Sequence, residues 1–245
     1  MESKVGSLAG RVAVVTGASS GIGRAIALAL SRQGVQLCLV GRNPKTLAET
    51  LTASQQFAEA ASFEIDLRVE ETLKPLALHL ERKVGKLDIL VHCAGVIYQA
   101  PMADALIEDF DVQYATNVRG PYLLTQRLLP WLTTTRGQVV FINSSVGLTA
   151  TRPDVGQYSA TKHALKAVAD SLRHEVNPKG IRVLSVYLGR TATPMQKALF
   201  QKEGRAYNSK VLLQPDDVAS VVVQILMLPR TAEVTDISIR PMLKT

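Results

Sequence analysis

The sequence predicts a doubly wound α/β fold in which about seven parallel strands carry helices on both faces. Apolar runs rich in Val and Ile alternate along the chain with segments of helical periodicity. Apart from a short N-terminal tail, the 245 residues contain no linker, repeat or low-complexity segment. We therefore expect residues 1–245 to form a single domain with one large core.

Short stretches of sequence predict the first strand and the first two helices. RVAVVTG predicts a buried strand, and the helix after it places Ile22, Ile26 and Leu30 on one face. Pro44 opens the next helix, as proline favours the first helical turn. The expected strands lie at 11–17, 35–41, 61–67, 86–95, 137–145, 180–189 and 233–241. The expected helices lie at 21–34, 44–57, 70–84, within 105–134, at 156–176 and at 215–228. The stretch 190–213 reads as a less regular loop.

Composition argues against several classes of function. The net charge is +7, but the basic residues are scattered and not interleaved with aromatics, which argues against nucleic-acid binding. No apolar run reaches the ~18 residues of a membrane helix, and MESKVGSLAG lacks the apolar region of a signal peptide. We expect a soluble, cytoplasmic protein with two reduced core thiols, Cys38 and Cys93, and no metal site.

A glycine cluster joins the first strand to the first helix. In TGASSGIG, the residues Gly17, Gly21 and Gly23 allow close backbone approach, and the helix that follows offers free N–H groups to a pyrophosphate. This arrangement predicts the dinucleotide site of a Rossmann fold.

The end of the second strand favours NADP(H) over NAD(H). An acidic residue there would accept from the ribose 2′-hydroxyl, but this chain has Arg42 and Asn43 instead. A guanidinium can pair with a 2′-phosphate. Asp66, expected to end the third strand, is a candidate acceptor for the adenine amino group.

Tyr158 and Lys162 form the most reactive pattern in the chain. Residues four apart share one face of a helix, so both side chains point the same way. A free phenol has a pKa near 10, and we expect the nearby ammonium to lower it. The pair would then act as a tuned proton donor beside the cofactor.

With these motifs in order, the sequence resembles the classical short-chain dehydrogenase/reductase family. TGASSGIG fits its glycine turn, YSATK its tyrosine–lysine motif, and INSSVG its fifth-strand motif. The family's catalytic serine precedes the tyrosine by thirteen residues, which gives Ser145, and ATNVRG supplies the fourth member, Asn117. The resemblance spans nearly the whole chain.

The resemblance implies hydride transfer from NADPH to a carbonyl carbon. Tyr158 would protonate the carbonyl oxygen, Ser145 would hydrogen-bond it, and Lys162 would tune the tyrosine and bind the ribose. In the family, the asparagine's main-chain carbonyl holds a water that relays protons. Pro121 has no N–H to bond the Asn117 carbonyl in a helix, which would leave that carbonyl free. Alternatively, Gly120-Pro121 ends one helix and begins another.

Two motifs depart from the family pattern. In LGRTAT, Gly189, Thr191 and Thr193 can contact the nicotinamide, but Leu188 replaces a proline. In HCAG, His92 replaces an asparagine that braces strands, and we expect a structural role for it. The complete set of expected cofactor-binding residues is Gly17, Ser19, Ser20, Gly21, Ile22, Gly23, Arg42, Asn43, Asp66, Leu67, Ala94, Gly95, Tyr158, Lys162, Gly189, Thr191 and Thr193.

Substrate contacts are expected in the loops beyond the carboxyl ends of the strands, at 96–100, 146–156 and 189–213. The candidates are Ile97, Leu148, Met195, Leu199 and Phe200, with the charged Arg152, Asp154 and Arg190. The two arginines could meet an anionic substrate or be rim residues. The segment 195–213 is a candidate lid.

Three interpretations remain open. The first is a carbonyl reductase, or an alcohol dehydrogenase working in reverse. The second is a 3-oxoacyl-carrier-protein reductase or a sepiapterin-reductase-like enzyme, whose bacterial members the tail LPRTAEVTDISIRP resembles. The third is a non-catalytic NADP(H) sensor, against which the intact set of four residues argues. The family also implies a homodimer or homotetramer, packed through 105–134 and 156–176.

Overall fold

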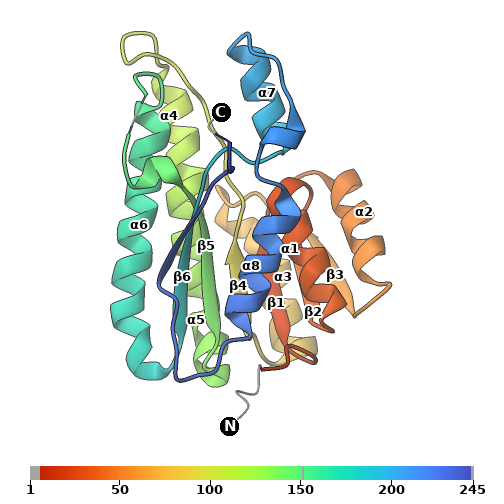
Figure 1. Ribbon diagram of the computed structural model, residues 1–245. Helices are drawn as coiled ribbons and strands as arrows, with labels where there is room; N and C mark the ends of the chain where they lie inside the picture. Colours follow the sequence, from red (N-terminus) through yellow and green to blue (C-terminus); the bar gives the residue numbers. More distant parts are fainter. Residues whose placement is uncertain (1–5, 151, 244–245) are drawn as a thin grey trace.

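The computed structural model describes residues 6–150 and 152–243, and its centre is a seven-stranded sheet (Figure 1). All strand pairs are parallel, in the order β3-β2-β1-β4-β5-β6-β7. The predicted α/β fold with seven parallel strands is therefore confirmed. The order changes direction between β1 and β4, which is where ligands bind in open sheets of this kind.

The strands agree closely with the predicted positions, although several are shorter. They are β1 (Val12–Thr16), β2 (Gln36–Gly41), β3 (Ala60–Glu64), β4 (Ile89–His92), β5 (Gln138–Ser144), β6 (Arg182–Leu188) and β7 (Asp236–Ile239). Asp66 lies two residues beyond β3 and does not end the strand as predicted.

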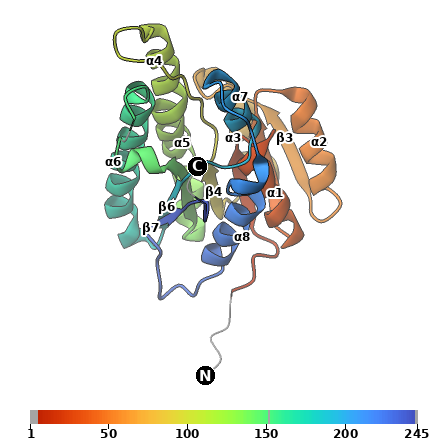
Figure 2. The ribbon, with the colours of Figure 1, turned by 45° about the horizontal axis from the view of Figure 1, so that its top comes forward.

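The helices cover both faces of the sheet (Figures 1 and 2). They are α1 (Gly21–Arg32), α2 (Pro44–Ser54), α3 (Lys74–His79), α4 (Ile107–Tyr114), α5 (Gly120–Thr135), α6 (Gly156–Val176), α7 (Pro194–Lys202) and α8 (Pro215–Leu226). Wider π turns extend α3 over Leu80–Val84 and join α4 to α5 over Ala115–Arg119. The chain thus stays helical from Ile107 to Thr135.

Alternate residues of each strand enter two separate cores. On β1, Ala13 and Val15 pack with α1 and α8, whereas Val12 and Val14 pack with α3, α5 and α6. The central strands are buried on both faces, which explains why they read as unbroken apolar runs.

Helix α7 is an element that the sequence interpretation missed. It lies inside the stretch 190–213, where we expected irregular structure. Thr193 caps its first turn by accepting from the Gln196 N–H, and Pro194 occupies the first helical position. Figure 1 shows α7 above the carboxyl ends of the strands, where the predicted lid would be.

Within the described residues, no helix has the length and apolarity needed to cross a membrane. The same part of the chain contains no group of three or more His, Cys, Asp or Glu arranged to hold a metal ion. Cys38 is buried, Cys93 is partly buried, and both are free thiols.

Candidate active site

A cavity of about 840 Å³ lies at the carboxyl ends of the strands. Every residue that we expected to bind cofactor lines it, from Gly17 in the glycine turn to Thr193 at the start of α7. Ser145, Tyr158 and Lys162 line it as well, whereas Asn117 does not. The structure thus brings the predicted phosphate end and the predicted chemical end into one continuous space.

The glycines of the first turn are required by close backbone contacts. A Cβ on Gly17, whose φ is +69°, would lie 2.8 Å from the backbone nitrogen of Ala94. A Cβ on Gly23 would lie 2.3 Å from the carbonyl oxygen of Gly17. Any larger residue would therefore displace the turn, and α1 begins directly behind it at Gly21. This cradle at a helix N-terminus fits a phosphate-bearing dinucleotide.

Thr16 fixes the neighbouring loop, a role that the sequence did not reveal. Its Oγ1 accepts hydrogen bonds from the backbone N–H groups of Cys93 and Ala94, at 3.0 and 3.1 Å. It also donates to the carbonyl of Val91 at 3.3 Å. These bonds hold the loop after β4 against the glycine turn, so that Ala94 and Gly95 face the cavity.

Ser19 has a buried hydroxyl with no hydrogen-bond partner among the described residues. Its Oγ lies so close to Gly41, at the end of β2, that a Cβ there would be 2.2 Å away. Buried hydroxyls normally have a partner. Ser19, Arg42 and Thr46 line the same part of the cavity, so a polar ligand group at this point would satisfy the hydroxyl.

Two other expected nucleotide contacts already have partners in the chain. The Asn43 side chain caps α2 by accepting from the Thr46 N–H at 3.1 Å. The Asp66 carboxylate binds Arg68, with 2.6 Å between Oδ2 and Nη2. This hydrogen bond is the main reason why the pKa of Asp66 lies below its ordinary value.

Tyr158 and Lys162 come from the first half of α6, one turn apart, as predicted. Lys162 Nζ lies 5.8 Å from the centroid of the Tyr158 ring and donates to the carbonyl oxygen of Ile142 at 3.2 Å. The expectation that the ammonium lowers the pKa of the phenol is wrong for this structure. Burial raises the pKa of Tyr158 to about 12, and burial lowers that of Lys162 to about 8. Burial is therefore the largest influence on the pKa of both groups.

Ser144 is the serine that influences the phenol, because its side chain partly opposes the rise in the pKa of Tyr158. Ser144 ends β5 and is half-buried, whereas Ser145 begins a short 3₁₀ turn and is exposed. The prediction of Ser145 counted thirteen residues back from Tyr158 and so assumed a fixed length for the loop before α6.

Asn117 lies in the π turn between α4 and α5, and its side chain braces the loop after β4. Its Oδ1 accepts from the Val96 N–H and its Nδ2 donates to the Val96 carbonyl, both at 2.9 Å. Nδ2 also donates to Thr161 of α6 at 3.1 Å. The chain is helical through Pro121, as the prediction of a free Asn117 carbonyl requires. That the carbonyl is free to hold a water stays a prediction.

His92 has the environment of a structural residue. Its Nε2 lies 2.8 Å from Thr125 Oγ1 of α5, and its ring stacks on Phe141 of β5 at 4.8 Å. Burial lowers its pKa to about 3, so the ring is neutral at physiological pH. The side chain links β4 to its neighbours, in keeping with the bracing role that we expected.

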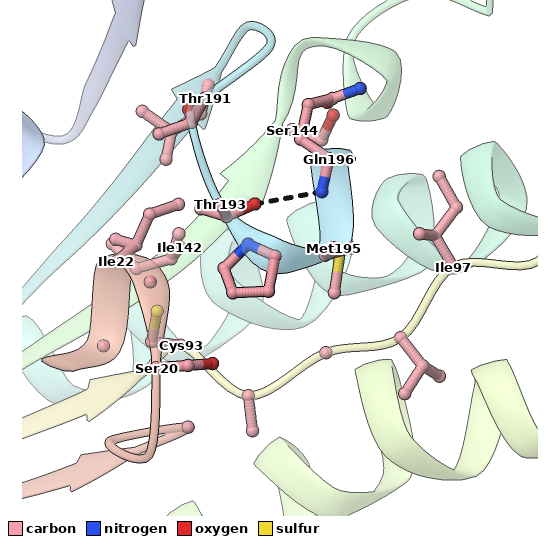
Figure 3. Close-up of a pocket in the computed structure, with 18 of the residues that line it drawn as sticks. Ser20, Ile22, Cys93, Ile97, Ile142, Ser144, Thr191, Thr193, Met195 and Gln196 are labelled. Carbon is pink, nitrogen blue, oxygen red and sulfur yellow. Dashed lines mark hydrogen bonds between the residues drawn. The ribbon is translucent and has the colours of Figure 1, made fainter. Parts of the chain in front are cut away.

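The loop after β6 approaches the glycine turn. Figure 3 shows Thr193 bonded to the backbone nitrogen of Gln196, close to Ser20 and Ile22 of the glycine turn. A Cβ on Gly21 would lie 3.0 Å from the Thr193 side chain. Leu188, which replaces the family's proline, is buried and paired with Ile239. The C-terminal residues Arg240, Pro241 and Leu243 also line the cavity, which the sequence gave no reason to expect.

The predicted substrate residues divide into two groups. Ile97, Met195 and Leu199 line the cavity, as do Arg152 and Arg190. Leu148, Asp154 and Phe200 do not line it, and the buried Phe200 packs against Arg190. Glu203, at the end of α7, also lines the cavity and was missed.

The comparisons with known proteins agree with this geometry. Residues 11–204 match the family model described as short chain dehydrogenase. An uncharacterised oxidoreductase of Staphylococcus epidermidis is 33% identical over 234 residues, covering 94% of this chain and 97% of that protein.

Two solved structures show what similar proteins bind. A short chain dehydrogenase of Shigella flexneri complexed with NADP has a TM-score of 0.85 at 28% identity, covering 96% of this chain and 99% of that one. A short chain dehydrogenase of Mycobacterium paratuberculosis bound to NAD has a TM-score of 0.84 at 26% identity, covering 96% and 97%. A nicotinamide cofactor, NAD or NADP, is thus typical of proteins with this fold.

Proposed function

Because the chain belongs to the short-chain dehydrogenase/reductase family, we propose that this oxidoreductase uses NADP(H) to interconvert a carbonyl and an alcohol, in the manner of a carbonyl reductase. One observation carries the proposal. The cavity that holds the glycine cradle is also lined by the half-buried Tyr158 and the buried Lys162. The site and all seven strands belong to one unit, and we propose residues 1–245 as a single domain.

The chemistry supplied by the bound cofactor is a hydride, which adds to the carbonyl carbon while the nicotinamide is oxidised. The residues of this chain supply the proton. With a pKa of about 12, Tyr158 is protonated throughout the neutral range and can donate its phenolic proton to the carbonyl oxygen. The phenol is then the general acid of the reductive direction.

Ser144 is our candidate for stabilising the developing negative charge. Its hydroxyl lies at the end of β5, acts on the Tyr158 phenol and lines the cavity. A hydroxyl so placed can donate to the same oxygen that Tyr158 protonates. Lys162 is the nearby cation, and its charge would stabilise the tyrosinate that remains after the proton is transferred.

The preference for NADP(H) rests on the residues at the end of β2. Arg42 lines the cavity there beside the unpartnered hydroxyl of Ser19. A guanidinium and a hydroxyl are complementary to a phosphate. A carboxylate at this position would instead repel it, and the chain has none between Gly41 and Thr46.

The proposal is tested by mixing the protein with NADPH and following the loss of its absorbance. The panel should contain ketones, aldehydes, an acetoacetyl thioester and a pterin, so that the narrower alternatives are tested together. We expect turnover of at least one carbonyl and its loss in Tyr158→Phe. Binding of NADPH without turnover of any compound would favour the non-catalytic sensor.

A further inference from the structure

The carboxylate of Glu203, at the end of α7, accepts hydrogen bonds from three guanidinium groups. It accepts from Arg152 Nη1 at 2.9 Å, from Arg190 Nη2 at 3.0 Å and from Arg205 Nη1 at 3.2 Å. Arg190 binds both of its oxygens. The Glu203 side chain is only 12% exposed. Such a shielded, multiply bonded carboxylate differs from an isolated surface ion pair, which contributes little.

The cluster joins segments that are distant in sequence. Arg152 belongs to the loop between β5 and α6, and Arg190 follows β6. Arg152 is also held by Asp154, with 2.6 Å between Nη2 and Oδ2. A third loop is joined through Lys202, which donates to the carbonyl of Gln99 at 2.7 Å. Helix α7 is therefore tied to the loops after β4, β5 and β6.

The helix is also packed against the cluster. The Phe200 ring lies 4.8 Å from the Arg190 guanidinium and 4.9 Å from that of Arg205. Phe200 is buried and does not line the cavity, while Met195 and Leu199 of the same helix do. Holding Glu203 in place thus keeps Met195 and Leu199 at the substrate end.

The cluster stays charged over the physiological range. Although burial raises the pKa of Glu203, hydrogen bonds from Arg190 and Arg152 lower it to about 2. Arg152 and Arg190 line the cavity, and their positive charge is paired with carboxylates: Arg152 donates to Asp154 and Glu203, and Arg190 donates to Glu203 through both Nη atoms. A substrate anion would have to compete with these carboxylates for the two guanidinium groups.

We propose that Glu203 is a positioning and specificity residue, which fixes α7 over the substrate end and withholds Arg152 and Arg190 from substrate anions. The reaction would accordingly favour an uncharged carbonyl compound over its carboxylate analogue. This inference rests on the proposed carbonyl reduction. Arg240 also lines the cavity and forms no ion pair with the described residues.

The test compares the wild-type protein with Glu203→Gln, which keeps the shape of the side chain but removes its charge. The control is Glu49→Gln, whose carboxylate pairs with Arg24 at 3.5 Å and is 49% exposed, outside the cavity. The first measurement is hydrogen–deuterium exchange of the amides of 194–203 in the full-length protein with NADPH. The second is kcat/KM for methyl acetoacetate and for acetoacetate.

In Glu203→Gln we expect exchange in 194–203 to be about tenfold faster or more, because α7 loses its anchor. The ratio of kcat/KM for acetoacetate to that for the methyl ester should rise about tenfold, since two guanidinium groups become available, and KM for the ester should increase. Glu49→Gln should change none of these. Unchanged exchange or an unchanged ratio in Glu203→Gln would overturn the proposal.

If the wild-type protein reduces neither compound nor any other carbonyl, the proposed function fails. The exchange measurement still decides whether Glu203 positions α7. Should Glu203→Gln fail to fold, Arg152→Gln removes one of the three arginine contacts of Glu203 and is expected to accelerate exchange in the same segment. Slow exchange in that variant would equally reject the role of the cluster.

Discussion

Lys162 Nζ donates a hydrogen bond of 3.2 Å to the carbonyl oxygen of Ile142 from a residue that is only 5% exposed. A single carbonyl does not replace the hydration of an ammonium group, so burial lowers the lysine pKa to about 8 from 10.5. Between these two pKa values the unfolded chain binds more protons than the folded one. The lysine therefore destabilises the fold below pH 8, and this cost disappears as the pH rises through 10.5.

Replacement of this lysine by a neutral side chain should stabilise the protein. We expect Lys162→Met to raise the free energy of unfolding at pH 7 by about 2 kcal/mol, from a pKa effect of roughly 3 kcal/mol less the lost hydrogen bond. The gain should vanish near pH 10.5. Urea denaturation of variant and wild type at both pH values measures this difference, with Lys45→Met as an exposed control. A gain independent of pH would mean that charge burial is not its cause.

The two adjacent serines should differ in their effect on catalysis. Removing the hydroxyl of Ser144, which acts on Tyr158, should lower kcat/KM by about 10²–10³, the usual effect of losing one donor to a developing oxyanion. Ser145→Ala should have little effect, because the side chain is exposed in the turn after β5. Steady-state kinetics with NADPH and a ketone rank the two variants. A larger loss of kcat/KM in Ser145→Ala than in the Ser144 variant would instead support Ser145, the serine predicted from the thirteen-residue spacing.

Arg42 should discriminate between the two nicotinamide cofactors. Arg42→Ala should raise KM for NADPH by roughly 10–100-fold, since a charge-assisted contact with a phosphate is lost, and should leave KM for NADH almost unchanged. Arg127→Ala, which removes a guanidinium paired with Glu70 outside the cavity, serves as the control. An equal change for both cofactors would eliminate the argument for a 2′-phosphate contact.

Exposed apolar side chains on α4 and α5 support the expected self-association. Ile107 and Tyr114 are exposed on α4, and Tyr122 is 58% exposed on α5. Such a group of side chains indicates a contact surface. Light scattering should give two or four times the 26.5 kDa chain mass, and Tyr122→Glu should lower it. A measured mass of 26.5 kDa for the wild-type protein would show a monomer and contradict the predicted self-association.

Much of the fold could be predicted because its determinants are local. Val12–Thr16 reads as a buried strand, and Gly17, Gly21 and Gly23 mark the turn into a helix. Close contacts such as Gly23 against Gly17 then explain why those positions tolerate no side chain. The seventeen residues expected to bind cofactor, from these patterns and from the family resemblance, all line one cavity.

The errors arose where long-range packing decides the outcome. Helical spacing put Lys162 beside Tyr158, but only the packed structure shows that burial is the largest influence on the pKa of each. The position of Ser144 is fixed by pairing with Leu188 on the neighbouring strand, which a count across a loop cannot detect. The role of Glu203 depends on arginines about 13 and 51 residues away, and no local pattern connects them.

The carboxyl-terminal residues Arg240, Pro241 and Leu243 form part of the cavity wall, and a Cβ on Gly189 would lie only 2.9 Å from Pro241. A purification tag fused behind these residues would therefore follow a segment that lines the cavity. Gly6, by contrast, bonds to Met227 at the far end of α8. An amino-terminal tag is the safer choice for kinetic work, and a carboxyl-terminal fluorophore would report on ligand entry.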